Sequence, residues 1–298
     1  MSAMKQAGVD ELVLASVERA LTEGGLSDAV GWLNGDAAKR IPKERLAPLW
    51  YRSAKNAMAL ERWGDAVTYL GKANQLRPTA LYQQRLHLVR HRREPALSLE
   101  GRGKLPKPHR LSPTAFVPEL TGVVACGQYH SRGTGSGLPW SRLLRDAKDP
   151  PHDREERNLI LSVAVACLCC VLQHEAAFLR EVDVVVAIPP DPERYARRGM
   201  SLPDALAVAV EKHLAVPWLQ EALLRTRSTE LRGLSRAKRA AAVRDSMRVG
   251  NLGPLDPKSV LLVDDVITSG ATLREAARLL KVAGVAEVYA AALSHTEG

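Results

Sequence analysis

Aromatic residues and cysteines are scarce in this sequence, and each shortage argues against a class of protein. Phenylalanine occurs twice, and aromatic residues make up 4% of the chain, so few rings are present on which nucleic-acid bases could stack. Three of the four cysteines lie within residues 167–170. Such clustering is not typical of a secreted protein that several disulfides stabilise.

Long apolar segments are also missing. The longest apolar run, residues 159–172, contains Ser162 and is shorter than the roughly 20 residues that a membrane-spanning helix requires. The start of the chain holds Lys5 and Asp10 in place of the apolar core of a signal peptide. These features predict a cytoplasmic protein that does not enter a membrane.

Positive charge is in excess. The 42 Lys and Arg residues outnumber the 33 Asp and Glu residues, which gives a formal net charge of +9. This excess favours polyanionic partners such as phosphate esters, nucleic acid or an acidic protein. The alternative is that arginines cover a solvated surface without a partner of this kind. Both interpretations stay open at this stage.

Residues 1–93 predict an all-α domain, because apolar residues recur at intervals of three and four without the alternation of strands. Trp50 and Trp63 stand near the starts of two predicted helices, and Ala66 and Pro78 follow. These spacings resemble one tetratricopeptide repeat, in which small residues let two helices cross closely and a proline ends the second. A plain helical bundle is the alternative.

Residues 94–118 predict a linker, since prolines and glycines recur there among basic residues such as Arg102, Lys104 and Lys107. A basic connector of this kind either contacts nucleic acid or serves as a solvated spacer. The positive charge of this segment is the only feature that favours direct binding of nucleic acid. Aromatic residues on which bases could stack are few.

Residues 119–298 change to alternating strand and helix patterns. Continuous apolar runs predict buried strands, and amphipathic stretches predict helices between them. The expected strands are 184–188, 259–263 and 288–293, and the expected helices are 202–214 and 272–282. Strands and helices in this rhythm predict an α/β domain with a parallel sheet flanked by helices.

The most informative segment is residues 260–272, Val-Leu-Leu-Val-Asp-Asp-Val-Ile-Thr-Ser-Gly-Ala-Thr. An apolar strand leads into two acids, and a short hydroxyl-rich turn leads into a helix. Ligands of open parallel sheets bind beyond the carboxyl ends of the strands, and the start of a helix offers backbone N–H groups to an anion. The segment therefore predicts a phosphate cradle, in which Gly270 lets the backbone approach its ligand.

Two acids at a strand end also occur in nucleotide hydrolases, but the Gly-x-x-x-x-Gly-Lys-Ser/Thr loop of those proteins is absent from the sequence. The segment instead resembles the signature of type I phosphoribosyltransferases, which bind phosphoribosyl pyrophosphate together with Mg²⁺. The resemblance implies that Asp264 and Asp265 are the catalytic acids and contact the ribose hydroxyls and the metal. It further implies that the 5′-phosphate is bound by Thr268, Ser269, Gly270, Ala271 and Thr272.

Basic residues flank this segment in the sequence. Arg194, Arg197 and Arg198 follow an expected strand, and guanidinium groups match phosphate oxygens with paired hydrogen bonds. If that strand ends at the same sheet edge as Asp264, the arginines are placed to bind the pyrophosphate; the alternative is a basic surface turn. A second basic stretch, residues 225–244, predicts either a loop that closes over the substrate or a solvated helix.

The order of these segments resembles the ComF family of competence-associated phosphoribosyltransferase-like proteins. The match rests on the proline-ended strand, the Arg-x-Arg-x-Thr segment at Arg225, the acid-pair signature, Tyr129 and the helix that carries Lys148. Members commonly begin with a four-cysteine zinc module, which the helical segment replaces here. The cysteines of this chain lack a second pair at zinc spacing, so we interpret them as small buried apolar residues.

The resemblance implies a type I phosphoribosyltransferase fold after an all-α, repeat-like domain. The implied reaction transfers ribose 5-phosphate from phosphoribosyl pyrophosphate to a nitrogen nucleophile, with Mg²⁺ as cofactor. Purine-salvage members place an acid three positions after the second Asp, where this sequence has Thr268, so no general base for a purine is offered there. The alternative function is a non-catalytic ligand sensor or adapter in DNA uptake, whose helical domain binds a protein partner.

Overall fold

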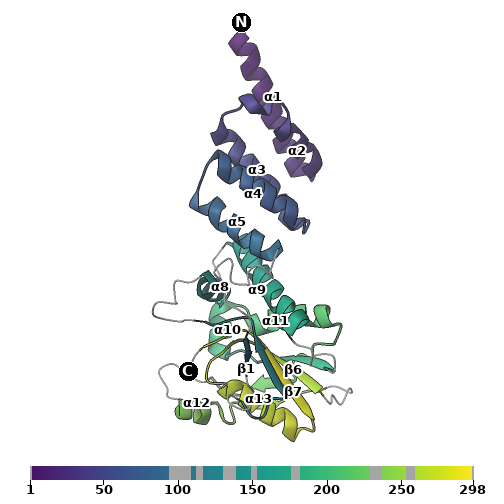
Figure 1. The fold of residues 1–298 in the computed structure, drawn as a ribbon, viewed down its shortest axis with the longest axis vertical. Helices are drawn as coiled ribbons and strands as arrows, with labels where there is room; N and C mark the ends of the chain where they lie inside the picture. The colour runs from purple at the N-terminus through teal and green to yellow at the C-terminus, as the bar shows by residue number, and fades with distance from the viewer. Residues whose placement is uncertain are drawn as a thin grey trace. The chain divides into compact units, whose positions relative to one another are not determined.

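The chain divides into two compact units, Met1–Glu94 and Pro95–Gly298. Figure 1 colours the first unit from purple to blue and the second from teal to yellow. The computed structural model describes residues 2–93, 109–111, 117–129, 139–148, 153–175, 182–228, 236–252 and 259–296.

Helices make up the first unit, as the apolar spacing predicted. Gly24 has a φ of +84°, a conformation that glycine adopts without strain, and it separates the first two helices. Pro42 precedes the third helix, where its fixed φ suits a helix start. The elements are α1 (Ser2–Glu23), α2 (Leu26–Asn34), the short 3-10 helix η1 (Ala38–Arg40), α3 (Lys43–Ala59), α4 (Trp63–Leu76) and α5 (Ala80–Arg93).

Helices α3 and α4 pack against each other along their length. Ala66 and Ala73 of α4 are fully buried, and their small side chains let the neighbouring backbone approach. The Trp50 ring of α3 lies 5.6 Å from the Tyr69 ring of α4. Pro78 follows the end of α4, where it cannot continue the helix. Of the residues that carried the resemblance to a tetratricopeptide repeat, Trp50 and Ala66 are buried, Trp63 is partly buried and Pro78 is exposed.

Replacing Ala66 by leucine should destabilise the helical unit by about 1–3 kcal/mol, because the site is fully buried and added methylenes force neighbouring side chains apart. Urea unfolding followed by far-ultraviolet circular dichroism measures this change. The matched control is Ala80→Leu, since Ala80 is exposed at the start of α5. Equal stability of the two variants would contradict the close packing at Ala66.

A five-stranded sheet forms the centre of the second unit. Its strand order is β1-β2-β7-β6-β3, in which β2, β7, β6 and β3 run parallel and β1 is antiparallel to β2. This arrangement confirms the predicted α/β domain with a parallel sheet. The strands are β1 (His109–Leu111), β2 (Gly122–Ala125), β3 (Val184–Ala187), β6 (Ser259–Ile267) and β7 (Glu287–His295).

Helices cover both faces of the sheet. On one face α9 (Arg154–Glu175) contacts β2 and β7, α11 (Leu202–Leu214) contacts β3 and β6, and the two helices contact each other. On the other face Ala276 and Leu280 of α13 (Ala271–Val282) share an apolar cluster with Leu262 of β6. Successive strand residues point to opposite faces, so Leu261 points toward α9 and α11. The sheet is thus buried on both sides, which explains its continuous apolar strands.

Three segments differ from the predictions. Strand β6 continues to Ile267, past the expected end at residue 263, because the acid pair still belongs to the strand. The basic stretch 225–244 begins in the unexpected strand β4 (Leu223–Arg225), which pairs with β5 (Met247–Val249). It also contains helix α12 (Arg236–Val243), in agreement with the helix alternative. Residues 229–235 of that stretch lie outside the described part of the chain.

The predicted linker 94–118 also contains structure. Its residues 109–111 form β1, which pairs with β2, because an exposed sheet edge offers unpaired backbone groups to a neighbouring strand. The rest of the proposed linker, apart from residues 117 and 118, lies outside the described residues. Within the described chain, no helix is both long and apolar enough to cross a membrane.

Candidate functional site

A cavity of about 350 Å³ lies at the carboxyl ends of β3 and β6. Parallel pairing of Ala187 with Val263 brings the residues that follow each of them to the same sheet edge. Four cations and three acids line the cavity, so its charge favours an anionic ligand. These charged residues are Lys148, Asp191, Arg194, Arg198, Arg225, Asp264 and Asp265.

Asp264 and Asp265 occupy consecutive positions on β6 and therefore point to opposite sides of the strand. The backbone N–H of Asp265 donates a hydrogen bond to Asp264 Oδ1 at 2.7 Å. On the other side of the strand, Lys148 Nζ lies 3.1 Å from Asp265 Oδ2, and both side chains are about one-fifth exposed. The acid pair thus lies in the cavity with one carboxylate already paired to a cation.

Burial and, second to it, the neighbouring charge of Asp265 raise the pKa of Asp264 from its usual value to about 7. The backbone hydrogen bond from Asp265 and the positive charges of Lys148 and Arg225 act in the opposite direction. A carboxyl with this pKa changes charge near neutral pH, so binding of a metal or a hydroxyl at Asp264 is sensitive to pH in that range.

The raised pKa of Asp264 predicts that the protein loses stability as pH rises. The folded protein holds the proton more tightly than the unfolded chain, so the stabilisation is complete below about pH 4 and disappears as pH passes about 7. From pH 6 to 8, the free energy of unfolding should fall by about 1 kcal/mol from this group. Urea titrations at the two pH values measure the fall, and the Asp264→Asn variant should lack this part. An unchanged pH dependence in the variant would refute the assignment.

The turn after the acids has the backbone geometry of an anion site. Gly270 adopts a left-handed φ of +71° at the N-terminal cap of α13, a conformation that costs other residues free energy. Thr268 and Thr272 line the cavity on either side of this turn. Ser269 and Gly270 lie in the turn and Ala271 is the first residue of α13, and these three residues are not among the lining residues. The first N–H groups of α13 and its dipole are then available to a phosphate.

Two of the three predicted arginines line the cavity. Arg194 and Arg198 lie on the short helix α10 (Pro192–Arg198) and contribute to the wall of the cavity. Arg197 is exposed on the same helix and is not among the lining residues. The expected turn is therefore a helix, which Asp191 caps by accepting a hydrogen bond from the Arg194 N–H at 3.3 Å.

Lys148 and Arg225 are the positively charged lining residues to which the sequence assigned no role. Arg225 Nε donates to the Pro189 carbonyl at 3.4 Å, and its Nη1 donates to Ser246 Oγ at 3.4 Å. Burial lowers the pKa of Arg225, which the acids Asp191 and Asp264 partly offset. Lys148 and Arg225 both lie in segments that carried the family resemblance, the lysine-bearing helix and the Arg-x-Arg-x-Thr segment. Neither sequence pattern indicates which acid lies next to its cation.

The acid pair fits Mg²⁺ better than a metal held only by protein. Among the described residues, no group of three or more His, Cys, Asp and Glu side chains is arranged to hold a metal. Mg²⁺ commonly takes one or two carboxylates and completes its octahedron with waters and substrate phosphates. Asp264 and Asp265 could supply those carboxylates.

The cysteines are mostly buried. Cys126 and Cys167 are buried, and Cys169 and Cys170 are partly buried. Burial raises the pKa of the Cys126 thiol, as the interpretation of these residues as small and apolar predicted.

Comparisons with known proteins agree with this arrangement. The phosphoribosyl transferase domain family matches residues 213–296, which include the acid pair and the turn. The DNA utilization protein YhgH of Salmonella typhi is 30% identical over 197 residues, covering 62% of this chain and 84% of that protein. The chain belongs to the ComF family. Its C-terminal unit is accordingly a phosphoribosyltransferase domain of type I fold.

Two other relatives match this chain over different lengths. The YhgH protein of Escherichia coli strain K12 is 28% identical over 197 residues, with the same coverage of 62% and 84%. Competence protein F of Haemophilus influenzae is 31% identical over 112 residues, which are 37% of this chain and 49% of that protein.

Proposed function

We propose that the C-terminal unit binds phosphoribosyl pyrophosphate with Mg²⁺ and transfers ribose 5-phosphate to a nitrogen nucleophile. One observation carries this proposal: a single cavity is lined by the acid pair, by both threonines of the phosphate turn, and by Arg194 and Arg198. These are the groups that a donor with a diol, a phosphate and a pyrophosphate requires.

Each group has a defined role in the proposed reaction. Asp264 and Asp265 accept hydrogen bonds from the ribose hydroxyls and hold Mg²⁺, which would neutralise charge on the departing pyrophosphate. The turn from Thr268 to Thr272 binds the 5′-phosphate and so fixes the sugar. Arg194 and Arg198 stabilise the pyrophosphate as the bond to the anomeric carbon breaks. Catalysis then rests on positioning and electrostatics.

The residue at position 268 restricts the acceptor. Thr268 occupies the place where purine-salvage phosphoribosyltransferases have an acid, and its hydroxyl is no general base at neutral pH. The proposed enzyme therefore does not use hypoxanthine-type purines, and its acceptor must lose its proton without help from this position.

Calorimetric titration of the full chain with phosphoribosyl pyrophosphate and Mg²⁺ tests the proposal. We expect a dissociation constant on the order of micromolar, as for a ligand with several charge-assisted hydrogen bonds. Titration with pyrophosphate alone shows how much of the affinity comes from the arginines. No heat of binding at millimolar donor would reject the proposed function.

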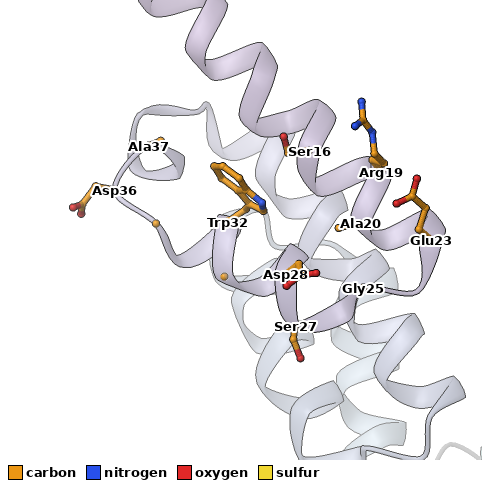
Figure 2. Close-up of a pocket in the computed structure, with 12 residues that line it drawn as sticks. Ser16, Arg19, Ala20, Glu23, Gly25, Ser27, Asp28, Trp32, Asp36 and Ala37 are labelled. Carbon is orange, nitrogen blue, oxygen red and sulfur yellow. The ribbon is translucent and has the colours of Figure 1, made fainter.

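A second candidate function is a non-catalytic adapter in DNA uptake. The relatives' names refer to DNA utilization and competence, and the helical unit has a groove of about 870 Å³ lined by residues of α1 and α2. Figure 2 shows Trp32, Asp28 and Glu23 around it. Trp32 is 49% exposed, and tryptophans in such grooves are typical of protein interfaces.

The two candidates differ in which variant loses function. In a transformable host that lacks its own ComF protein, the adapter interpretation expects Trp32→Ala to reduce DNA uptake while Asp264→Asn/Asp265→Asn leaves it intact. The enzyme interpretation expects the opposite result. Circular dichroism of both purified variants shows whether either has simply failed to fold.

A further inference from the structure

The sheet order separates the proposed pyrophosphate site from a different group of residues. The arginines of α10 follow β3, the acid pair lies on β6, and β7 and β2 lie beyond β6. Tyr129 follows β2, and its N–H donates to the His295 carbonyl at the end of β7, at 2.7 Å. Tyr129 therefore lies on the side of the acid pair opposite to Arg194 and Arg198. Lys148 lines the same cavity as those arginines, and its Nζ approaches the Tyr129 ring.

This separation matters for the chemistry of glycosyl transfer. A nucleophile that replaces pyrophosphate at the anomeric carbon approaches from the side opposite to the departing group, because the orbitals must align along that line. With pyrophosphate on the β3 side of the acid pair, the acceptor approaches from the β7 side. Among the described residues, Tyr129 lies on that side, and the Lys148 ammonium lies close to its ring.

The Lys148 ammonium is held between two groups. Its Nζ lies 3.1 Å from Asp265 Oδ2 and 5.6 Å from the centroid of the Tyr129 ring. An ammonium carries three N–H donors, so Lys148 can contact Asp265 and still donate to a ligand. The Tyr129 ring adds a flat surface on which an aromatic ligand stacks.

We propose that Tyr129 and Lys148 form the acceptor subsite, and that the acceptor is a planar nitrogen heterocycle with a negative charge, as a carboxylate or an ionised ring oxygen. This inference rests on the proposed function. Lys148 pairs with the negative charge and Tyr129 stacks against the ring. Solvent takes up any proton on the attacking nitrogen, which agrees with the absence of a general base at Thr268.

The proposed step is balanced without a further reactant. The ring nitrogen donates its electron pair to the anomeric carbon as the bond from that carbon to the pyrophosphate oxygen breaks. Pyrophosphate leaves with the bonding electrons, and solvent takes any proton on the attacking ring nitrogen as the N–C bond forms. The negative charge of the ring is the feature that Lys148 recognises.

Nucleoside monophosphates test the subsite, because their 5′-phosphate enters the phosphate turn and their base enters the acceptor position. The probes are orotidine 5′-monophosphate, whose base carries a carboxylate, AMP, whose base is neutral, and ribose 5-phosphate, which has no base. Calorimetry should show wild-type protein binding the orotidine nucleotide about tenfold more tightly than AMP, as one charge-assisted hydrogen bond provides. Lys148→Met should abolish this preference, and Lys148→Arg should keep most of it.

Tyr129→Leu should weaken the binding of both nucleotides relative to that of ribose 5-phosphate. Lys212→Met serves as the control because Lys212 is exposed at the end of α11. An equal preference in wild-type protein and Lys148→Met would overturn the proposal, as would tighter binding of AMP than of the orotidine nucleotide by wild-type protein. If ribose 5-phosphate and phosphoribosyl pyrophosphate both fail to bind, the proposed function fails first. Binding of these two without any gain from a base rejects the acceptor subsite alone.

Discussion

The Asp264→Asn/Asp265→Asn double variant is expected to bind phosphoribosyl pyrophosphate and Mg²⁺ at least about 100-fold more weakly than the wild type. Hydrogen bonds to charged groups contribute about 1.5–3 kcal/mol each, and both carboxylates lie in the same cavity. Asparagine keeps the shape of each side chain but removes the charge that would hold the metal. Calorimetric titration with the donor measures the loss.

The control for this variant is Asp36→Asn in the helical unit, where the side chain is 86% exposed. It should bind the donor as the wild type does. Unfolding curves should also show that the double variant is folded, because neutralising Asp264 removes a buried charge. Wild-type affinity in the folded double variant would reject the assignment of the acid pair.

Replacing Gly270 by alanine is expected to weaken donor binding by about 10- to 100-fold, which corresponds to about 1.4–2.8 kcal/mol. Gly270 has a φ of +71° at the cap of α13, so a side chain there strains the backbone by about 1 kcal/mol. The same change places a methyl group on the turn that should enclose the 5′-phosphate. Titration with ribose 5-phosphate isolates this part of the donor.

A matched glycine separates strain from binding. Gly284 has a φ of +102°, follows the opposite end of α13, and has no atom within 4 Å of an added Cβ. Gly284→Ala should therefore lose a similar free energy of unfolding, about 1 kcal/mol, and bind ribose 5-phosphate normally. Equal losses of affinity in the two variants would show that stability, and not contact with phosphate, controls binding.

Much of the site could be predicted because its central part is continuous in the chain. The apolar strand, the acid pair, the glycine turn and the next helix occupy residues 259–282. Short-range rules describe such a segment well, since strand burial, the backbone freedom of Gly270 and helix start signals are all local properties. The all-α character of the first unit was predictable for the same reason, from its spacing of apolar residues.

Contacts between residues that are far apart in the sequence could not be predicted from local sequence patterns. Lys148 and Asp265 are far apart in sequence, and only the packing of the chain before β3 against the sheet places the ammonium 3.1 Å from the carboxylate. The sequence likewise predicted the same role for all three arginines. In the structure, the orientation of α10 brings Arg194 and Arg198, but not Arg197, into the cavity wall. Strand β1 was missed because pairing at a sheet edge depends on backbone groups more than on side-chain pattern.

The sequence by itself determined the two kinds of unit, the ComF resemblance and the acid-pair segment with its phosphate turn, since these depend on residues close together in the chain. The tertiary structure decided that Lys148 pairs with Asp265, that Arg194 and Arg198 reach the cavity, and that Tyr129 lies near Lys148. The physical reason is that the order and parallel pairing of β2, β7, β6 and β3 fix which strand ends become neighbours, and no local pattern specifies that order.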